Sequence, residues 1–219
     1  MESGLVLQAV DLRGPNADGP GSDALLLEPV EAARAAALEP GARARFVAGR
    51  AVLRHFAADL LELPAGDLEV HYSCPRCGSG PGVAHGRPGY ALRGEPLPLL
   101  LSMARTRQWI LLAGLPASGA GMRLGVDAED PSRLDFEGFD AVALSGAERR
   151  AVDRLSGEGL LRERARLWAR KEAWLKMTGE GLRADPSAVD VLDKHGITDL
   201  DPADTGLPGA FVAAVALDG

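Results

Sequence analysis

Residues 166–179 constrain the fold of this chain most, because their composition predicts one long helix. Ala, Leu, Arg, Lys, Glu and Met favour helix, and Gly179 and Gly181 provide a stop. Glu172 and Lys176 are four residues apart and would share one face of that helix. Apolar side chains recur every seven residues on the nearly opposite face: Leu160, Leu167 and Trp174. The helix should bury one side and present an acid and a base on the other, although such a pair is often only a solvated surface pair.

A second acidic element precedes this helix in the chain. Residues 122–126 predict a strand that runs into Asp127 and Glu129, which would project to the same face of an extended chain. Two adjacent carboxylates repel each other unless a cation lies between them. With Glu172 they would provide three oxygen ligands, which suits a Mg²⁺ ion that keeps some waters and also holds substrate phosphates. The nearby Asp130, Asp135 and Glu137 are expected to be ordinary solvated acids.

Two motifs in this half of the chain resemble the paired signature of 4′-phosphopantetheinyl transferases. They read Gly125-Val126-Asp127-x-Glu129 and Trp168-x-x-Lys171-Glu172-Ala173-x-x-Lys176-x-x-Gly179-x-Gly181-Leu182. The length of 219 residues is similar to the large monomeric type, related to the surfactin-synthetase activator. The resemblance implies an α/β (α+β) fold of two similar subdomains, each a small sheet packed on a long helix, with the cofactor in the cleft between them. Residues 1–115 would contact the phosphates of coenzyme A, and residues 116–219 would carry the carboxylates and the catalytic helix.

The resemblance also implies a reaction and roles for individual residues. The family transfers the 4′-phosphopantetheine arm of coenzyme A to a serine of an apo carrier protein (acyl or peptidyl), releasing adenosine 3′,5′-bisphosphate. Asp127, Glu129 and Glu172 would bind Mg²⁺, which neutralises charge on the pyrophosphate as it breaks. Lys176 would lie on the pyrophosphate or stabilise the leaving phosphate, and Glu172 is a candidate general base as well as a metal ligand.

A second long helix is predicted over residues 43–63, where arginines cluster in the first half. By itself the cluster is typical of a solvated face. The run around Arg45, Arg50 and Arg54 is similar to the family helix whose basic residues approach the phosphates of coenzyme A. Four arginines within twelve residues of an acidic protein favour an anion as the partner, with Arg54 the first candidate and Arg50 the second.

A segment rich in cysteine and histidine follows a strand predicted over residues 68–72. Cys74, Cys77 and His85 suggest zinc, with His71 as an optional fourth ligand, but one Cys-x-x-Cys with loosely spaced histidines is a weak signal. A disulfide between the two cysteines would need oxidising conditions. The run of residues 85–88 resembles the family's Gly-Lys-Pro or Gly-Arg-Pro turn, so Arg87 is a further candidate contact for coenzyme A, or else a solvated turn residue.

The chain departs from the family pattern between two strands predicted over residues 97–102 and 108–115. The family has Ser-His-Ser or Ser-His-Thr there, and alignment on Trp109 places Ala104, Arg105 and Thr106 at those positions. Arg105 can supply positive charge to a phosphate of coenzyme A but has no titratable proton near neutral pH. This departure leaves an alternative: a catalytically impaired module that binds coenzyme A or a carrier protein.

Composition limits the remaining possibilities. A net charge of −7 argues against a general nucleic-acid binder, and no apolar run approaches the roughly 20 residues that span a bilayer. Two cysteines and no export signal favour the reducing cytoplasm. Loops are expected over residues 13–22 and, as a hinge, over 116–121. Ser145 and Glu148 form a predicted capping box, residues 28–38 a helix, and residues 189–192 and 211–217 strands.

Overall fold

The computed structural model describes residues 4–13, 26–116, 119 and 121–219. Most of the predicted loop over residues 13–22 and part of the predicted hinge over 116–121 lie outside these ranges. The chain divides into two compact units. Unit 1 comprises Met1–Val6, Val10–Ser102 and Gly114–Ala120, and unit 2 comprises Leu7–Ala9, Met103–Ala113 and Gly121–Gly219. The predicted subdomains, residues 1–115 and 116–219, stay a prediction.

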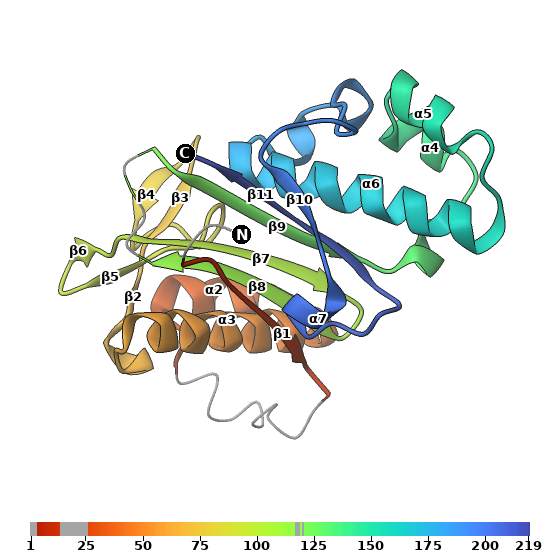
Figure 1. Cartoon of the computed structure of the whole chain (residues 1–219). Coiled ribbons are helices and arrows are strands. Elements are labelled where there is room, and N and C mark those ends of the chain that lie inside the picture. Colours follow the sequence, from red (N-terminus) through yellow and green to blue (C-terminus); the bar gives the residue numbers. More distant parts are fainter. Residues whose placement is uncertain (1–3, 14–25, 117–118, 120) are drawn as a thin grey trace. The chain divides into compact units, whose positions relative to one another are not determined.

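The fold class is mixed α/β, with several small sheets and long helices, as predicted (Figure 1). Each unit contains one helix of 22 residues, α3 (Pro40–Leu61) in unit 1 and α6 (Gly157–Thr178) in unit 2. The helix predicted over residues 166–179 is thus the second half of a longer helix. It ends at Gly179, which adopts a left-handed conformation with φ of 78° and donates its N–H to the carbonyls of Leu175 and Lys176.

Unit 1 is built on α3, whose buried face carries Phe46, Leu53 and Phe56. Gly114 allows strand β8 (Trp109–Pro116) to approach this helix, since a Cβ at Gly114 would lie 2.3 Å from Leu60 Cδ1. Two small antiparallel arrangements complete the unit, a sheet in the order β2-β5-β6 and the hairpin β3-β4. The further elements are α2 (Pro29–Ala36), η2 (Ala65–Asp67), β2 (Glu69–Val70), β3 (Tyr72–Cys74), β4 (Gly78–Gly80), β5 (Tyr90–Leu92) and β6 (Glu95–Pro96).

A third sheet has the order β1-β8-β7 and is made of strands whose residues are shared between the two units. The strands are β1 (Val6–Asp11), β7 (Leu99–Thr106) and β8 (Trp109–Pro116). The sequence predicted that residues 103–107 connect the second and third of these strands, and this was wrong. Strand β7 continues to Thr106, with Ala104 and Thr106 buried and Arg105 exposed, so the turn is shortened to Arg107 and Gln108. Arg107 accommodates this tight turn with a φ of 53°.

Unit 2 is an antiparallel sheet in the order β10-β11-β9 with α6 packed against β9 and β11. Small residues form the contact between helix and sheet: Ala169, Ala173, Ala214 and Ala216, with Met177 beside them. Of the predicted heptad, Leu167 is fully buried, whereas Leu160 and Trp174 are partly buried. The elements are β9 (Arg123–Glu129), η3 (Pro131–Arg133), α4 (Phe139–Ala143), α5 (Gly146–Val152), η4 (Gly181–Arg183), η5 (Pro186–Ala188), β10 (Ile197–Leu200), α7 (Pro202–Thr205) and β11 (Val212–Asp218).

The strand predicted over residues 189–192 does not form. Side chains of α6 take up the backbone carbonyls of this segment: Arg170 donates to Val191 O at 3.0 Å and Leu192 O at 3.3 Å, and Lys171 donates to Val189 O. These carbonyls therefore bond to side chains and not to a neighbouring strand. The edge position in the sheet is taken by β10, which pairs with β11 and which the sequence did not predict.

Helix α5 begins with the predicted capping box. Ser145 accepts a hydrogen bond from Glu148 N at 3.2 Å, and the Glu148 carboxylate accepts one from Ser145 N at 2.7 Å.

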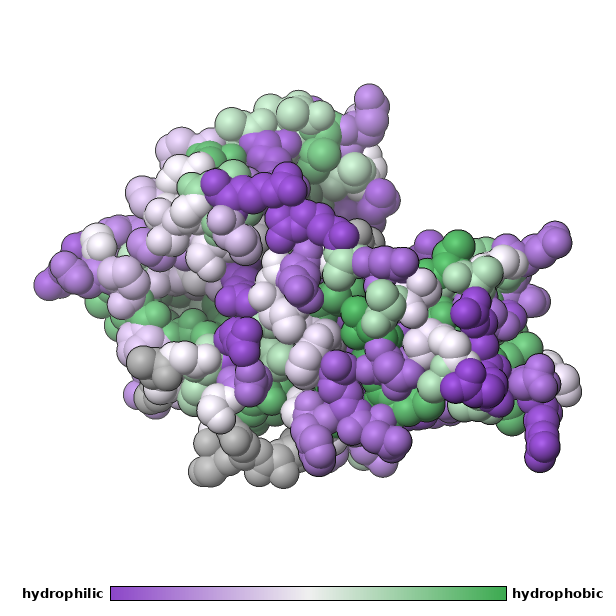
Figure 2. Space-filling model, turned by 90° about the horizontal axis from the view of Figure 1, so that it is seen from above, coloured by the Kyte–Doolittle hydropathy of each residue, from purple (hydrophilic) through white to green (hydrophobic). Residues whose placement is uncertain are grey.

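On the surface shown in Figure 2, hydrophilic residues are spread widely and hydrophobic residues form small areas between them. Within the described ranges, no helix combines the length and apolar character needed to cross a membrane.

Candidate functional site

Strand β9 and helix α6 bring the predicted acidic and basic side chains into one neighbourhood of unit 2. Asp127 and Glu129 lie near the C-terminal end of β9, where their backbones are opposite Ala214 and Val212 of β11. Glu172 and Lys176 come from the adjacent helix α6. The direct contact between the two elements is an ion pair, with Lys176 Nζ 2.6 Å from Asp127 Oδ1.

Gly125 permits the close approach of β9 to α6. A Cβ at this position would lie 2.0 Å from the carbonyl oxygen of Ala173 and 2.6 Å from the backbone nitrogen of Met177. Both are backbone atoms of the helix, so a side chain at Gly125 could not be accommodated by a rotamer change alone. The glycine of the first motif thus sets the distance at which Asp127 faces the helix.

Lys176 is fully engaged by acceptors of unit 2. In addition to Asp127 Oδ1, its Nζ donates to the carbonyl oxygens of Val126 at 3.0 Å and Met103 at 3.3 Å. Three acceptors match the three N–H donors of an ammonium group. The ammonium is therefore held beside the carboxylates, and its side chain is still about a quarter to a third exposed, at 29%.

The carboxylates of this site have raised pKa values. Burial is the main cause for Asp127, although the ion pair with Lys176 opposes it. The pKa of Glu129 rises to about 8, first because of burial and then because Asp127 and Glu172 repel its charge. Burial, followed by repulsion from Asp127, also raises the pKa of Glu172. Full ionisation of the three carboxylates would place more negative charge here than Lys176 alone balances, so a bound cation would favour their ionised forms.

The fit of a divalent cation can be judged from these groups. Asp127 Oδ2 is buried and has no hydrogen-bond partner among the described residues, so it is an oxygen available as a ligand. In the described part of the chain, however, the three carboxylates do not form a closed set with one oxygen each close enough to share an ion. Mg²⁺ is commonly bound through one or two carboxylates, several waters and substrate phosphates. The donor set fits that mode of binding, whereas simultaneous direct ligation by Asp127, Glu129 and Glu172 stays a prediction.

A buried ion pair behind the site was missed by the sequence analysis. Lys171 and Glu148 are both fully buried, with Lys171 Nζ 2.7 Å from Glu148 Oε2. Lys171 also donates to Pro186 O at 2.8 Å and to Val189 O, while Glu148 Oε1 accepts from Val191 N at 2.9 Å. The network joins α6 and α5 to residues 186–191. Lys171 is part of the second motif and Glu148 part of the capping box, but their spacing in sequence gives no sign that they meet.

Asp130 is not an ordinary solvated acid, as the sequence analysis expected. The residue is 7% exposed, forms an ion pair with Arg107, and accepts hydrogen bonds from the backbone and hydroxyl of Ser132. Burial alone would raise its pKa, but these contacts outweigh it and lower the pKa of this carboxyl. Asp130 thus attaches the start of η3 to the turn after β7, just beyond Glu129.

Two candidate arginines of unit 1 have partners inside the protein. Arg54 is 3% exposed, pairs with the buried Glu31 at 3.5 Å and donates to Leu68 O. Arg50 also pairs with Glu31 at 3.5 Å, and it donates to Tyr72 Oη and to Ala84 O. Contact of either guanidinium with a phosphate would require these bonds to be exchanged. Their roles in binding coenzyme A stay predictions, and the buried Glu31 that accounts for their inward orientation was missed.

The other two candidate arginines lie in extended segments. Arg87 pairs through its backbone with Ser73, with its N–H 2.9 Å from Ser73 O. Arg105 lies on β7 with an exposed side chain, and it belongs to unit 2, as do Asp127, Glu129 and Glu172.

The cysteine segment differs from expectation: Cys74, Cys77 and His85 come together, while His71 is not part of that group among the described residues.

These arrangements can be compared with known proteins. The family model described as the 4′-phosphopantetheinyl transferase superfamily matches residues 123–200. This segment, about a third of the chain, is similar to that superfamily. It runs from the start of β9 to the end of β10 and contains the four site residues Asp127, Glu129, Glu172 and Lys176. No curated protein matches the chain. The matched domain supports transferase activity of this general kind, whereas unit 1 lies outside the match.

Proposed function

We propose that this chain is a Mg²⁺-dependent 4′-phosphopantetheinyl transferase, of the large monomeric type, that acts on apo acyl or peptidyl carrier proteins. One observation carries the proposal. A segment that matches the superfamily gathers three carboxylates with raised pKa values around Lys176, and it leaves Asp127 Oδ2 buried and without a partner among the described residues. A structural ion pair with Lys176 would need only one carboxylate, whereas three acids with perturbed pKa values lie in this neighbourhood.

The reaction is a phosphoryl transfer with simple atom balance. The hydroxyl oxygen of the carrier serine forms a bond to the phosphorus that bears the pantetheine arm. The bond from this phosphorus to the bridging oxygen breaks, and adenosine 3′,5′-bisphosphate leaves with that oxygen. The serine proton passes to a base. Most of the catalysis in such reactions comes from positioning and from stabilisation of charge.

The carboxylates of β9 are proposed to hold the metal. Bound Mg²⁺ would neutralise charge on the pyrophosphate oxygens and orient the leaving group. Asp127 would bind through Oδ2, the oxygen that Lys176 does not use, and Glu129 would bind directly or through water. The ionised state of Glu129 that such binding requires is opposed in the metal-free site, where its pKa is about 8.

Glu172 has two possible roles, ligand and base, and one carboxylate can hardly perform both strongly. Its pKa is raised by burial, which makes it a better proton acceptor than an ordinary carboxylate once it is ionised. We rank the metal-ligand role first and proton removal from the serine, directly or through water, second. Glu172→Asp would shorten the side chain while keeping its charge, and should reduce turnover under both assignments.

Lys176 is proposed to act on the leaving group. Its ammonium is held by Asp127 Oδ1 and two backbone carbonyls, so its position is set before substrate binds. A preorganised positive charge of this kind stabilises charge that develops as the bridge breaks. Lys176→Ala should therefore lower kcat by roughly 10² to 10³, with a smaller change in KM for coenzyme A.

Arginines are proposed to bind the phosphates of coenzyme A. Arg87 and Arg105 are the stronger candidates, because neither position is deeply buried. Arg50 and Arg54 would contribute through positive charge near the ligand or by holding α3 in place around Glu31. Arg105 stands where the family has a histidine, so an acid or base role of that histidine is not transferred to this chain.

A specific observation also favours a second candidate function, a module that binds coenzyme A or a carrier protein without transfer. Arg105 replaces a titratable side chain with a permanently charged one. Retention of Asp127, Glu129, Glu172 and Lys176 argues for catalysis, since binding alone has no need of the complete set.

Mass spectrometry of the carrier decides between the two. The full chain is incubated with Mg²⁺, coenzyme A and apo carrier domains of fatty acid, polyketide and nonribosomal peptide type, and each carrier is weighed. The transferase predicts a gain of one phosphopantetheine group with wild type, and no gain with Glu172→Gln or Asp127→Ala. Glu137→Gln, an exposed acid of the same unit, is the matched control and should behave as wild type. Unmodified carriers that an unrelated transferase can still modify would contradict the proposal, and a stable complex would then support the binding module.

A further inference from the structure

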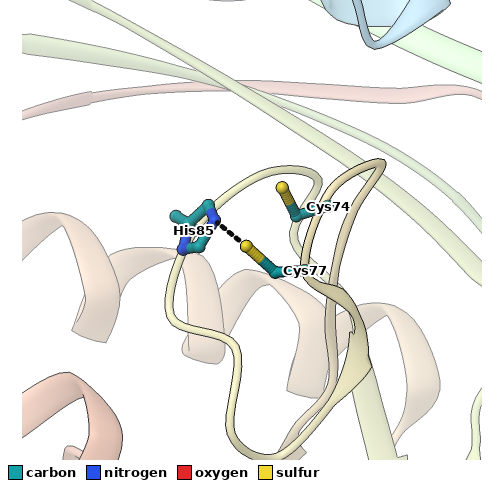
Figure 3. Close-up of side chains that lie close together, drawn as sticks. All are labelled: Cys74, Cys77 and His85. Carbon is teal, nitrogen blue, oxygen red and sulfur yellow. Dashed lines mark hydrogen bonds between the residues drawn. The ribbon is translucent and has the colours of Figure 1, made fainter.

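The cysteine segment of unit 1 brings three potential metal ligands together, and the proposed reaction uses none of them. Cys74 ends β3, Cys77 lies in the turn of the β3-β4 hairpin, and His85 lies in the segment that follows β4 (Figure 3). One ligand atom from each of the three lies within 4.8 Å of the others. Cys77 Sγ and His85 Nε2 are 3.3 Å apart.

The hairpin itself positions the two sulfurs. Cys74 is paired with Gly78, so three residues form the turn. Gly78 has a φ of 81°, which residues other than glycine rarely adopt. Backbone N–H groups of Arg76 and Cys77 donate to the sulfur of Cys74. Turns in which backbone N–H groups surround a thiolate suit metal binding, because the metal takes the deprotonated form.

The histidine is held beside the hairpin by backbone contacts that do not depend on a metal. Ser73 N donates to Arg87 O at 3.0 Å, and Arg87 N donates to Ser73 O at 2.9 Å. Gly86, between His85 and Arg87, has a φ of 88°, and a Cβ there would lie 2.2 Å from Ser73 O. Glycine is therefore required for the chain to pass this close to β3, and the passage places His85 next to Cys77.

The separation of the Cys77 and His85 ligand atoms is close to that of two ligands on one tetrahedral zinc ion. With bonds of about 2.3 Å to sulfur and 2.05 Å to nitrogen, tetrahedral ligands would be about 3.8 Å apart for two sulfurs and about 3.6 Å for sulfur and nitrogen. The observed distance of 3.3 Å between Cys77 Sγ and His85 Nε2 is within a few tenths of an ångström of this value. Two thiols and an imidazole are also the ligand types that select zinc over Mg²⁺.

We propose that Cys74, Cys77 and His85 form a site for Zn²⁺, with water or an external ligand in the fourth position. Within the described residues the cluster contains no fourth cysteine, histidine or carboxylate. The ion would cross-link the β3-β4 hairpin to the turn formed by residues 85–88. Cys77 and His85 are exposed, so the ion would exchange with solvent and be removable by a chelator.

The metal content of the full chain tests this directly. Protein purified under reducing conditions is measured for zinc, then stripped and titrated with Co²⁺, whose thiolate charge-transfer band in the near ultraviolet reports Cys–metal bonds. Wild type should contain one zinc per chain and show the band. Cys77→Ser and His85→Gln should weaken Co²⁺ binding about tenfold or more, since even changes to groups that only orient a ligand cost 10- to 100-fold. His55→Gln, an exposed histidine on α3, is the matched control and should leave binding unchanged.

Clear results would overturn the site. Absence of the Co²⁺ band in reduced wild type would do so, as would zinc retained in full by both variants. Recovery of Cys74 and Cys77 as a disulfide that binds no metal after reduction would assign the pair to redox chemistry instead. Both variants replace exposed side chains, and circular dichroism confirms that they fold. Because metal content is read without any transfer assay, failure of this site and failure of the proposed transferase are distinguishable.

Discussion

Replacing Lys171 by methionine should destabilise unit 2 strongly. The side chain is completely buried, and its ammonium pairs with the equally buried Glu148 at 2.7 Å. Methionine has nearly the same length, so little volume is lost, and the change mainly removes the charge and its three hydrogen bonds. Glu148 would then keep its bonds from Ser145 N and Val191 N but lose its counter-ion.

The magnitude follows from what is left behind. Removing one partner of a buried ion pair typically costs about 3 to 5 kcal/mol, because the other charge stays buried. The carbonyls of Pro186 and Val189 also lose their donor, and each unsatisfied group costs about 1 kcal/mol or more. We expect the free energy of unfolding to fall by about 5 kcal/mol, the low end of the sum of these two terms. With a urea dependence of about 2 to 3 kcal/mol per M, the midpoint would drop by roughly 2 M.

Tryptophan fluorescence during urea unfolding is the suitable assay, since Trp109, Trp168 and Trp174 all belong to unit 2. Lys194→Met is the matched control: this lysine lies over the ring of Trp174 and should contribute about 1 kcal/mol or less. The double variant Lys171→Met with Glu148→Gln should be less destabilised than the sum of the two single variants. A loss below about 1 kcal/mol for Lys171→Met, or strict additivity in the double variant, would refute a tight buried pair.

Three further outcomes are expected. Gly125→Ala should cost about 1 to 3 kcal/mol or more in urea unfolding, because its Cβ would lie 2.0 Å from Ala173 O; an unchanged midpoint would contradict the close packing. Glu129 keeps its proton in the metal-free folded chain up to about pH 8, whereas in the unfolded chain it loses this proton at about pH 4.3. Stability of the metal-free chain therefore falls as pH rises through that window, and Mg²⁺ should raise the Tm more at about pH 9 than at about pH 6, a difference that Glu129→Gln removes. Arg87→Gln should raise KM for coenzyme A more than KM for the analogue without the 3′-phosphate. Arg54→Gln should mainly lower the Tm. The reverse pattern would indicate that Arg54, and not Arg87, contacts the ligand.

Local patterns in the sequence predicted those parts of the structure that local interactions determine. The long helix and its end at Gly179 follow from helix propensity and from the freedom of glycine to adopt positive φ. The Ser145 and Glu148 capping box is likewise read from residues three apart. The strand that carries Asp127 was predicted from the apolar residues Leu124 and Val126 just before it. In each case the partners lie within a few residues of each other.

The wrong predictions share a different cause, contacts between distant residues. The strand expected over residues 189–192 fails because Arg170 and Lys171 of α6 take its carbonyls. Asp130 is buried because Arg107, 23 positions earlier, reaches it. The pairing of Arg54 with Glu31, also 23 positions away, was missed for the same reason, whereas the role of Arg54 toward coenzyme A stays a prediction. Periodicity along the chain cannot reveal such distant partners of a charged residue.

In the run Lys171-Glu172-Ala173, the two outer residues fix the position of the middle one. Lys171 attaches the helix to Glu148 and to the residues 186–191 segment, which opposes rotation of α6 about its axis. Ala173 faces Gly125, whose missing side chain brings β9 against the helix. Glu172, between them, therefore has its backbone held from two directions while its carboxylate is directed toward the neighbourhood of Asp127 and Glu129. Since a catalytic carboxylate has to be held within a fraction of an ångström of its working position, two residues without chemistry of their own are needed beside the one proposed to act.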